Sequence, residues 1–420
     1  MHVTEAIDWI YHRQVFGIKP GLERLVLLLA DLGNPHGSLH AVLVGGTNGK
    51  GTVARVTAAA LQHSGQRVGL FTSPHLHTFG ERLLINGEQP TNEVLAKLIT
   101  RIKPIAERHE ATFFEIVTAL ALLYFAEQRV DYAVLEVGLG GTYDATNIVF
   151  PVASAVVSVA LDHTEILGDT IGAIAGDKAG IFRAGLPAIT GATGEALAVL
   201  TERAAHIGAP LANTADIEIT VHEHSLTGQR FTLRTPSETV QVTTPLIGVH
   251  QPSNLAVAYL LCRALGVPTS AFVHAAAHAQ HAARLEVLPG EPTWLVDGAH
   301  NPAAAEALAS TLTTTGTKPA VLLLGTSHEK DQRELAHILG PVAPHIVVAA
   351  AEHSPRATPV AELQELLPCA HAASSIEAAM AKARELAAGG LVLVAGSLFI
   401  AAEVRALVLG IRADEQERQQ

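Results

Sequence analysis

The 420-residue sequence predicts an α/β protein with two domains, each built on a mostly parallel sheet. Apolar runs alternate with helix-like segments twice, first in the N-terminal half and again in the C-terminal third. Parallel strands are buried on both faces, so they read as continuous apolar runs, and the helices between them cover the sheet. The stretch Leu288–Pro292 contains two prolines and a glycine and predicts a linker between the two series. We therefore expect a first domain over residues 1–287 and a smaller Rossmann-like α/β domain over residues 288–420.

The strands of the first domain are predicted from short runs that are apolar or rich in β-branched residues. They are residues 41–44, 68–71, 132–137, 153–159 and 188–190. Helix-like stretches lie between and after them, at residues 53–63, 91–107, 115–128, 250–266 and 269–284. A polar, threonine-rich stretch over residues 217–244 interrupts this order, and Gln229–Arg234 alternates polar and apolar side chains. Because such alternation is typical of a half-buried strand, we expect a small antiparallel appendage there.

In the second domain, apolar runs separated by Ala- and Leu-rich segments predict buried parallel strands. The runs are residues 294–297, 320–325, 345–350 and 391–396. Ligands of open α/β sheets bind beyond the carboxyl ends of the strands, and small-molecule sites often lie between domains. We therefore expect the site in a cleft between the two domains.

Composition and charge exclude several classes of protein. The chain is 48% apolar and only 16% charged, which is enough apolar material for a large core. Its formal net charge of −12 argues against a general nucleic-acid or anionic-membrane surface, so neither partner is expected. The two cysteines imply no disulfide framework, no apolar run is long enough to span a membrane, and the N-terminus lacks the apolar segment of a signal peptide. We expect a cytoplasmic protein.

The most informative motif is the run Gly45-Gly-Thr-Asn-Gly-Lys-Gly-Thr52 between the first predicted strand and helix. Its glycines let backbone N–H groups turn toward phosphate oxygens, and the following helix adds the positive end of its dipole. Lys50 can reach the outer phosphates, and the Thr52 hydroxyl can ligate Mg²⁺. Gly51 separates these two residues, which are adjacent in the usual P-loop pattern. The first domain is therefore predicted to be a P-loop ATPase domain, with an ordinary glycine turn as the alternative.

Three further residues follow predicted strands at the edge of the sheet where the P-loop opens. Glu136 lies near the end of the third predicted strand, at a Walker-B-like position for Mg²⁺. Ser73 follows the second strand, and His163 follows the fourth. Chemistry alone leaves other interpretations open, namely a solvent-facing glutamate, a capping serine and a loop histidine.

Taken together, these motifs resemble the folylpolyglutamate synthase/dihydrofolate synthase family, a branch of the Mur ligase superfamily. The glycine between Lys50 and Thr52 is typical of that branch. Six further runs match in the family's order and span most of the chain. They are Ser73-Pro-His-Leu76, Glu136-Val-Gly-Leu-Gly-Gly141, Asp144-Ala-Thr-Asn147, Leu161-Asp-His-Thr164, Asp177-Lys-Ala-Gly-Ile-Phe182 and Asp297-Gly-Ala-His-Asn-Pro302.

The resemblance implies an ATP-dependent amide ligase that adds L-glutamate to dihydropteroate, to tetrahydrofolate or to both. ATP would phosphorylate the folate carboxylate, and the amine of glutamate would attack this acyl phosphate, releasing ADP and phosphate. Two Mg²⁺ ions are implied, and we expect a monomer. Motif chemistry alone stops at a Mg²⁺-dependent nucleotide enzyme. Two alternatives stay open: a related Mur-type ligase with a different acceptor, and a non-catalytic P-loop protein that uses nucleotide as a switch.

The same resemblance assigns residues to the site. Metal ligands would be Thr52, Ser73, Glu136, His163 and Lys178, the last as a carbamate formed with CO₂. ATP contacts would be Asn48, Gly49, Lys50, Gly51, Thr52, Asn254, Arg284, Asp297 and His300. The catalytic residues would be Lys50, Lys178 and His163. Without the resemblance, Lys178 is interpreted as a solvated helix lysine and Arg284 as an ordinary surface charge.

The folate or pteroate end is implied at Thr112, Phe113, Phe114, Asp144 and Ala145. The two phenylalanines could offer a stacking surface, although core packing is the alternative for both rings. Family members often carry Gly-Gly-Arg before this aspartate, whereas Thr142 stands in place of the arginine here. We therefore expect substrate preference, rather than ATP binding, to depart from the family.

Histidines form one further pattern. His274, His278 and His281 fall at i, i+4 and i+7 of the predicted helix 269–284 and would share one face. Such a face could bind Zn²⁺, but no H-E-x-x-H pattern and no neighbouring cysteine accompany it. A solvent-facing row of histidines is predicted.

Overall fold

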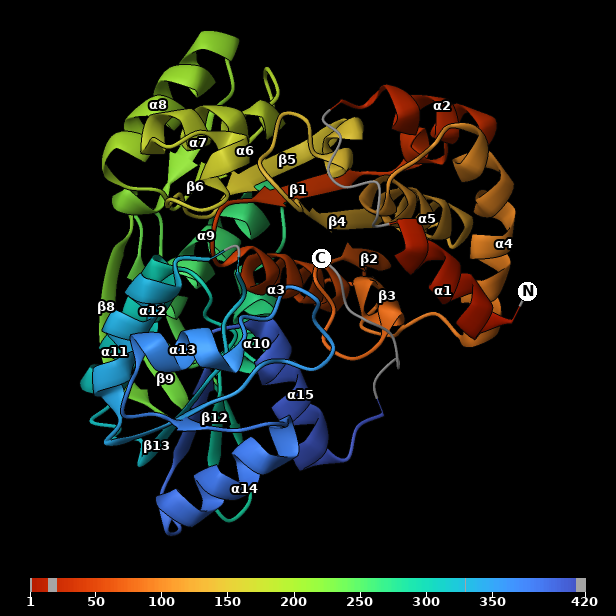
Figure 1. The fold of residues 1–420 in the computed structure, drawn as a ribbon. Coiled ribbons are helices and arrows are strands. Elements are labelled where there is room, and N and C mark those ends of the chain that lie inside the picture. Colours follow the sequence, from red (N-terminus) through yellow and green to blue (C-terminus); the bar gives the residue numbers. More distant parts are fainter. Residues whose placement is uncertain (1, 14–20, 329, 413–420) are drawn as a thin grey trace.

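The computed structural model describes residues 2–13, 21–328 and 330–412, and Figure 1 shows them as two α/β units. The N-terminal unit carries strands β1 to β10, and the C-terminal unit, in blue, packs beneath it. The predicted α/β class is confirmed, with parallel-rich sheets in both units. No helix in these ranges is long and apolar enough to cross a membrane.

The N-terminal unit is built on a seven-stranded sheet in the order β3-β2-β4-β1-β5-β6-β7. All neighbours pair in parallel except β3, which runs antiparallel to β2 at the edge. Its strands are β1 (Ala41–Gly45), β2 (Val68–Phe71), β3 (Leu83–Ile85), β4 (Tyr132–Glu136), β5 (Pro151–Val156), β6 (Ala188–Thr190) and β7 (Leu211–Asn213). Because β1 is the central strand, the glycine-rich turn that follows it lies in the middle of the row of strand ends.

Helices cover both faces of this sheet, as the apolar strands require. They are α1 (Val3–His12), α2 (Glu23–Asp31), α3 (Lys50–His63), α4 (Asn92–Arg108), α5 (Phe113–Glu127), α6 (Thr164–Leu167), α7 (Ile171–Lys178), α8 (Gly194–Ile207), α9 (Gln251–Ala264) and α10 (Thr269–Ala277). Short 3₁₀ turns join them at η2 (Pro35–Ser38), η3 (Phe79–Arg82), η4 (Ala145–Ile148), η5 (Ala179–Ile181) and η6 (Thr214–Asp216).

Alternate residues of β1 belong to two different cores, which shows how the sheet is covered. Ala41 and Leu43 pack with α1, α2, α4, α5, α7 and α8 on one face. Val42 and Val44 pack with α3, α9 and α10 on the other. Side chains of a strand point alternately to its two faces, so a fully apolar strand is stable only between two helical layers.

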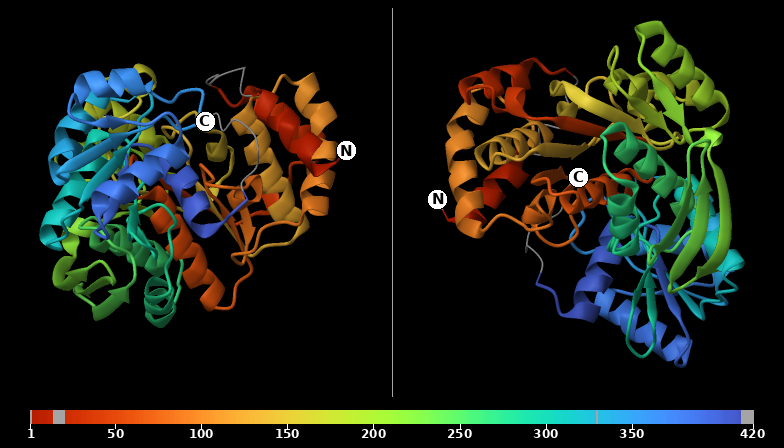
Figure 2. Two further views of the ribbon diagram at one scale, coloured as in Figure 1. Left: turned by 60° about the horizontal axis from the view of Figure 1, so that its bottom comes forward. Right: turned by 180° about the vertical axis from the view of Figure 1, so that it is seen from behind.

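The predicted antiparallel appendage is confirmed as a three-stranded sheet in the order β10-β9-β8. Its strands are β8 (Glu218–Ser225), β9 (Gly228–Arg234) and β10 (Thr239–Thr244). Phe231 and Leu233 of β9 are fully buried against the core around α9 and α10, while Arg230 and Arg234 are exposed. Figure 2 shows these long strands running along the side of the molecule between the two units.

The C-terminal unit has a six-stranded sheet in the order β11-β12-β16-β13-β14-β15. Its strands are β11 (Glu286–Leu288), β12 (Trp294–Val296), β13 (Val321–Leu324), β14 (His345–Val348), β15 (His371–Ala372) and β16 (Val392–Ala395). Its helices are α11 (Pro302–Thr314), α12 (Gln332–Leu339), η7 (Gly340–Val342), α13 (Val360–Leu366), α14 (Ile376–Ala387) and α15 (Leu398–Leu409). Helices α14 and α15 cover one face, and α11, α12 and α13 cover the other.

Two sequence predictions about the junction between the units are wrong. The helix predicted to reach Arg284 ends at Ala277, with His278 as its C-cap, and the positive φ angles of Ala283 and Leu285 show that the chain around Arg284 is not helical. The predicted linker Leu288–Pro292 is part of a hairpin, since β11 pairs antiparallel with β12 around it. The second sheet therefore begins at Glu286, and the boundary predicted after residue 287 cuts through β11.

Candidate active site

The glycine-rich turn connects β1 to α3, and its shape requires glycine at two positions. Gly46 and Gly49 have φ angles of 139° and 84°, which other residues rarely adopt. A Cβ on Gly49 would lie 2.4 Å from Oδ1 of Asn254, and one on Gly46 would lie 3.1 Å from the backbone of Ser158. Helix α3 begins directly after this turn, so its unpaired N–H groups and the positive end of its dipole face the turn. This is the geometry of an anion-binding loop.

Two lysines converge on this turn from different helices. Lys50 Nζ donates hydrogen bonds to the carbonyl oxygens of Gly46 and Thr47, both at 3.0 Å. Lys178, the last residue of α7, donates to the same Gly46 oxygen at 3.1 Å. Burial lowers the pKa of Lys50, and burial together with the nearby Lys50 lowers the pKa of Lys178 to about 7. Lys178 is therefore a buried amine beside the loop, not the solvated lysine that its local sequence suggests.

Glu136 ends β4 next to the same loop. Its Oε2 accepts a hydrogen bond from the backbone N–H of Ser73 at 3.1 Å, and its Oε1 lies 3.6 Å from a Cβ built on Gly51. Burial raises the pKa of Glu136, an effect that the positive charge of Lys50 opposes. The predicted neighbours Glu136, Ser73 and the first turn of α3 thus lie together.

Thr52 has a partner that the sequence did not predict. Its hydroxyl lies 2.9 Å from Nδ1 of His281, whose ring also lies against Gly51. His281 belongs to the loop after α10, so it does not share a helical face with His274 and His278, and the predicted row of three histidines is wrong. The cause is tertiary: the chain leaves α10 early and passes the P-loop on its way to β11.

His163 begins α6 in a left-handed conformation, with φ 51°. Its side chain is half exposed, and Nε2 lies 3.8 Å from Oδ1 of Asp162. Burial lowers the pKa of the ring, and the nearby Lys330 adds to this shift. His163 thus lies near the loop, close enough to Lys50 and Lys178 for their charges to lower the pKa of its ring further.

In the C-terminal unit, the residues that follow the carboxyl end of β12 face the P-loop. Asp297 follows β12, and its carboxylate accepts the backbone N–H groups of Leu285 and Ala299, each at 2.7 Å. His300 Nδ1 lies 2.8 Å from the Gly298 oxygen, and burial lowers the pKa of this ring to about 4. Asp297 and His300 therefore lie at the predicted strand end, with Asp297 shaping the turn through backbone contacts.

Arg284 lies just before this turn. Its Nη1 is 2.3 Å from a Cβ built on Gly298, so only glycine leaves room for the guanidinium there. Arg284 is partly buried and lies close enough to Glu136 for its positive charge to oppose the rise that burial causes in the pKa of that carboxyl. The structure thus brings Arg284 near Glu136, on the side of the P-loop.

A polar network that the sequence did not predict joins the two units directly. Asn48 of the P-loop exchanges amide hydrogen bonds with Asn301, at 3.2 and 3.3 Å. Asn301 also donates to Asp162, and Lys330 forms a 2.6 Å ion pair with the same carboxylate. Asn301 belongs to the run Asp297–Pro302 and Asp162 to the run Leu161–Thr164, so the sequence had pointed to both segments. No motif in the sequence pointed to Lys330.

The residues predicted for the folate end gather at the start of α5. Thr112 caps this helix, and its backbone and hydroxyl donate to Glu115 at 2.8 and 2.9 Å. The half-buried ring of Phe113 stacks on Tyr11, with a centroid distance of 6.0 Å and an angle of 16°. Phe114 packs against Gly138, where a Cβ would lie 2.4 Å from its ring.

Asp144 and Ala145 are buried in the loop beside these rings. One carboxylate oxygen of Asp144 accepts the N–H of Leu139, and the other accepts the N–H and hydroxyl of Thr146. These contacts show how Asp144 shapes the loop after Glu136. The Thr142 hydroxyl donates to the backbone carbonyl oxygen of Asp177, the residue before Lys178.

Two family models match the chain: the Mur ligase middle domain over residues 44–262, and the Mur ligase, glutamate ligase domain over residues 283–398. A probable bifunctional folylpolyglutamate synthase/dihydropteroate synthase from Haloferax volcanii is 38% identical over 96% of this chain and 50% of its own. The folylpolyglutamate synthase of Lacticaseibacillus casei is 33% identical over 98% of this chain and 99% of its own. A structure of Escherichia coli FolC in complex with DHPP and ADP is 31% identical, with a TM-score of 0.89 over 97% of this chain and 98% of that one. The chain thus spans about half the length of the first curated relatives that it matches.

Proposed function

The chain belongs to the folylpolyglutamate synthase/dihydrofolate synthase family of Mur ligases, and we propose that it joins L-glutamate to the carboxylate of dihydropteroate, of a reduced folate, or of both. The observation that carries the proposal is the convergence of Lys50 and Lys178 on the Gly46 carbonyl at the start of α3. A helix N-terminus with the Lys50 ammonium beside it suits the transfer of a phosphoryl group, and Lys178, whose pKa is lowered to about 7, places a second side chain there that can become a metal ligand. The hydrogen bond between Asn48 and Asn301 holds the C-terminal unit against the P-loop.

In the proposed reaction, the folate carboxylate attacks the γ-phosphorus of ATP, and the bond to the β-phosphate oxygen breaks as ADP leaves. Lys50 would hold the negative charge that develops on the phosphoryl oxygens. The amine of glutamate then attacks the carbonyl carbon of the acyl phosphate, phosphate leaves with the bonding electrons, and the nitrogen loses a proton. Closure of the two units would exclude water from the acyl phosphate.

The residues around the loop fit Mg²⁺, and we propose that they hold two ions. Mg²⁺ is usually bound through one or two carboxylates and the substrate's phosphates rather than by a complete protein cage. Glu136 offers one buried carboxylate beside Ser73 and the first turn of α3, as such a shared shell requires. Glu136, Thr52, Ser73, His163 and Lys178 as a carbamate would supply the protein's ligands. The chemistry that bound Mg²⁺ supplies is neutralisation of charge on the phosphate oxygens.

We expect Glu136→Gln to raise the Mg²⁺ concentration needed for half-maximal ADP release by more than about tenfold, because the amide keeps the shape and removes the charge. The matched control is Glu403→Gln in α15, another buried carboxyl that accepts two backbone N–H groups and whose pKa burial raises. An unchanged Mg²⁺ dependence in Glu136→Gln would show that Glu136 is not a ligand.

For the folate end, we propose that Phe113 and Phe114 flank the pterin and that Thr112, Asp144 and Ala145 shape the wall behind it. Loss of the Phe113 ring in Phe113→Ala should raise the KM for dihydropteroate by about two- to tenfold and leave the KM for ATP unchanged. Phe150→Ala is the matched control, because its ring is 72% exposed. Equal increases in both KM values would assign Phe113 to the core instead.

One assay tests the proposed function against its rivals. ADP release is measured with ATP, Mg²⁺ and L-glutamate, with dihydropteroate in one series and tetrahydrofolate in the other. Release that requires both glutamate and a folate supports the ligase. Nucleotide binding without this dependence would favour a switch, and dependence on glutamate with another carboxylic acid would favour a different acceptor. The cytoplasmic location and the monomeric state stay predictions.

A further inference from the structure

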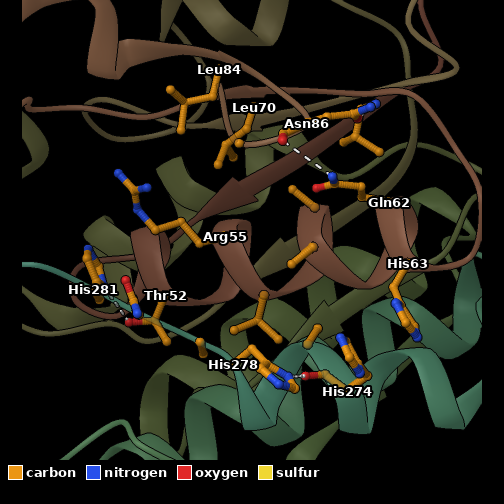
Figure 3. A pocket seen from close by; sticks show the side chains of 18 of the residues that line it. Thr52, Arg55, Gln62, His63, Leu70, Leu84, Asn86, His274, His278 and His281 are labelled. Atoms are coloured by element: carbon orange, nitrogen blue, oxygen red, sulfur yellow. Dashed lines mark hydrogen bonds between the residues drawn. The ribbon is translucent and has the colours of Figure 1, made fainter. Parts of the chain in front are cut away.

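The hydroxyl of Thr52 is held by a residue from outside its own segment. Thr52 is buried in the first turn of α3, and its Oγ1 lies 2.9 Å from Nδ1 of His281, the contact drawn in Figure 3. A threonine hydroxyl in a helix commonly bonds to a backbone carbonyl of the preceding turn instead. In the part of the chain that the structure describes, the His281 ring is the one hydrogen-bond partner of this hydroxyl. The orientation of the Thr52 hydroxyl therefore depends on His281.

Gly51 makes room for the His281 ring beside α3. A Cβ built on Gly51 would lie 3.0 Å from Cε1 and 3.2 Å from Nε2 of this ring. Both distances are shorter than an ordinary contact between non-bonded atoms, so a side chain at position 51 would push the ring away. The glycine that interrupts the usual P-loop pattern thus lets His281 approach, with Nε2 next to Gly51 and Nδ1 directed at Thr52.

The direction of this hydrogen bond decides how much of the hydroxyl oxygen stays available to a cation. The oxygen carries one proton and two lone pairs. If it donates its proton to Nδ1, both lone pairs stay free, whereas accepting a proton from Nδ1 would occupy one of them. Burial and the positive charges of Arg55 and Arg284 hold the pKa of His281 well below its usual range, and a bound cation would lower it further. The ring is therefore neutral, with one nitrogen that accepts a hydrogen bond.

We propose that His281 is a positioning residue for metal binding: with its proton on Nε2, its Nδ1 accepts the Thr52 proton, which fixes the hydroxyl and leaves both oxygen lone pairs for Mg²⁺. The inference rests on the proposed role of Thr52 as a Mg²⁺ ligand. His281 acts here through Thr52 and does not touch the cation. Residues that orient a metal ligand commonly contribute about 10- to 100-fold to metal affinity, so the loss of this one contact should be measurable.

The test compares His281→Asn with His281→Leu, two side chains of the same branching that differ in their polar atoms. The amide oxygen of asparagine can accept the Thr52 proton near the position of Nδ1, whereas leucine cannot. His281→Leu should raise the Kd for Mn²⁺ in the ADP complex by about tenfold, and His281→Asn should stay near the wild type. Mn²⁺ takes the same oxygen ligands as Mg²⁺, and EPR measures the free ion. His278→Leu is the matched control, because that ring precedes His281 in the same segment and stacks on His274.

Binding of ADP in EDTA, measured by calorimetry, separates the positioning of a metal ligand from simple packing. A ring that only supports the segment leading to Arg284 would affect nucleotide binding with and without metal. We expect the Kd for ADP in EDTA to be the same in the wild type, His281→Asn and His281→Leu. Equal losses with and without Mn²⁺, a loss in His281→Asn as large as in His281→Leu, or an unchanged Mn²⁺ affinity in His281→Leu would each overturn the proposal.

Thr52→Val completes a double-mutant cycle, because valine keeps the shape of threonine and has no hydroxyl for His281 to hold. Thr52→Val should weaken Mn²⁺ binding at least as much as His281→Leu, and the double variant should lose no more than Thr52→Val alone. A further loss in the double variant would overturn the proposal. Unchanged Mn²⁺ affinity in Thr52→Val would remove Thr52 as a ligand and this inference with it. The expected pattern in a protein that ligates no folate would support the inference and refute the ligase function alone.

Discussion

Lys50→Ala is expected to remove nearly all turnover and to leave the fold intact. Lys50 lies at the start of α3, where its ammonium contacts the carbonyls of the P-loop and stands near the carboxylate of Glu136. In the proposed reaction this charge faces the phosphoryl oxygens at the moment of transfer. Loss of one such preorganised group commonly costs about 10²- to 10³-fold in kcat, so we expect a decrease of that size.

The measurement is ADP release under saturating ATP, folate and glutamate, with thermal unfolding followed in parallel. Lys318→Ala is the matched control, because Lys318 is an exposed lysine of the C-terminal unit. Lys50→Ala with a wild-type Tm and wild-type ADP release would remove the basis of the ATPase assignment. Lys50→Arg should also be slow, since a guanidinium is bulkier and planar and cannot take the place of a compact ammonium.

Most of the fold could be predicted because a buried parallel strand appears in the sequence as a short, continuous apolar run. The runs at Val68–Phe71 and Ala188–Thr190 are strands with the same bounds in the structure, since both faces of each are covered by helices. The junction was harder, because prolines and glycines occur in linkers and in hairpin turns alike. Gly290, with φ 151°, serves the turn between β11 and β12.

The arrangement of the candidate site could be predicted where its parts are local and was missed where residues of distant segments pair. Lys50 and Thr52 belong to one turn and helix, so their spacing alone is enough to predict a phosphate-binding turn. The contact of Thr52 with His281 depends on how α10 ends, and the ion pair of Lys330 with Asp162 depends on how the two units dock. Neither pairing has a signature within its own segment, so no local pattern could have found it.

Lys178 shows how position rather than local sequence decides a residue's chemistry. Its segment predicts a solvated helix lysine, yet the end of α7 places it in the interior, 3.1 Å from the Gly46 carbonyl. Burial and the nearby Lys50 lower its pKa to about 7, so a large fraction of the amine is neutral at neutral pH. Only the neutral amine can attack CO₂, forming an N–C bond and releasing a proton to give the carbamate anion. The structure therefore supplies what this modification needs: a deprotonated amine beside the P-loop.

We accordingly expect Lys178→Ala to lose at least about tenfold in kcat, through a missing metal ligand, and to regain part of it when acetate is added. Lys178→Arg should be equally slow, because a guanidinium stays positively charged and forms no carbamate. The modification itself is measured by ¹³C NMR of protein equilibrated with ¹³CO₂, where the carbamate signal should be present in the wild type and absent from Lys178→Arg. Below the pKa of about 7 the signal should fade as the amine becomes protonated. Full activity in Lys178→Arg would rule out the carbamate, and Lys178 would then act as a plain cation that supports the loop through Gly46.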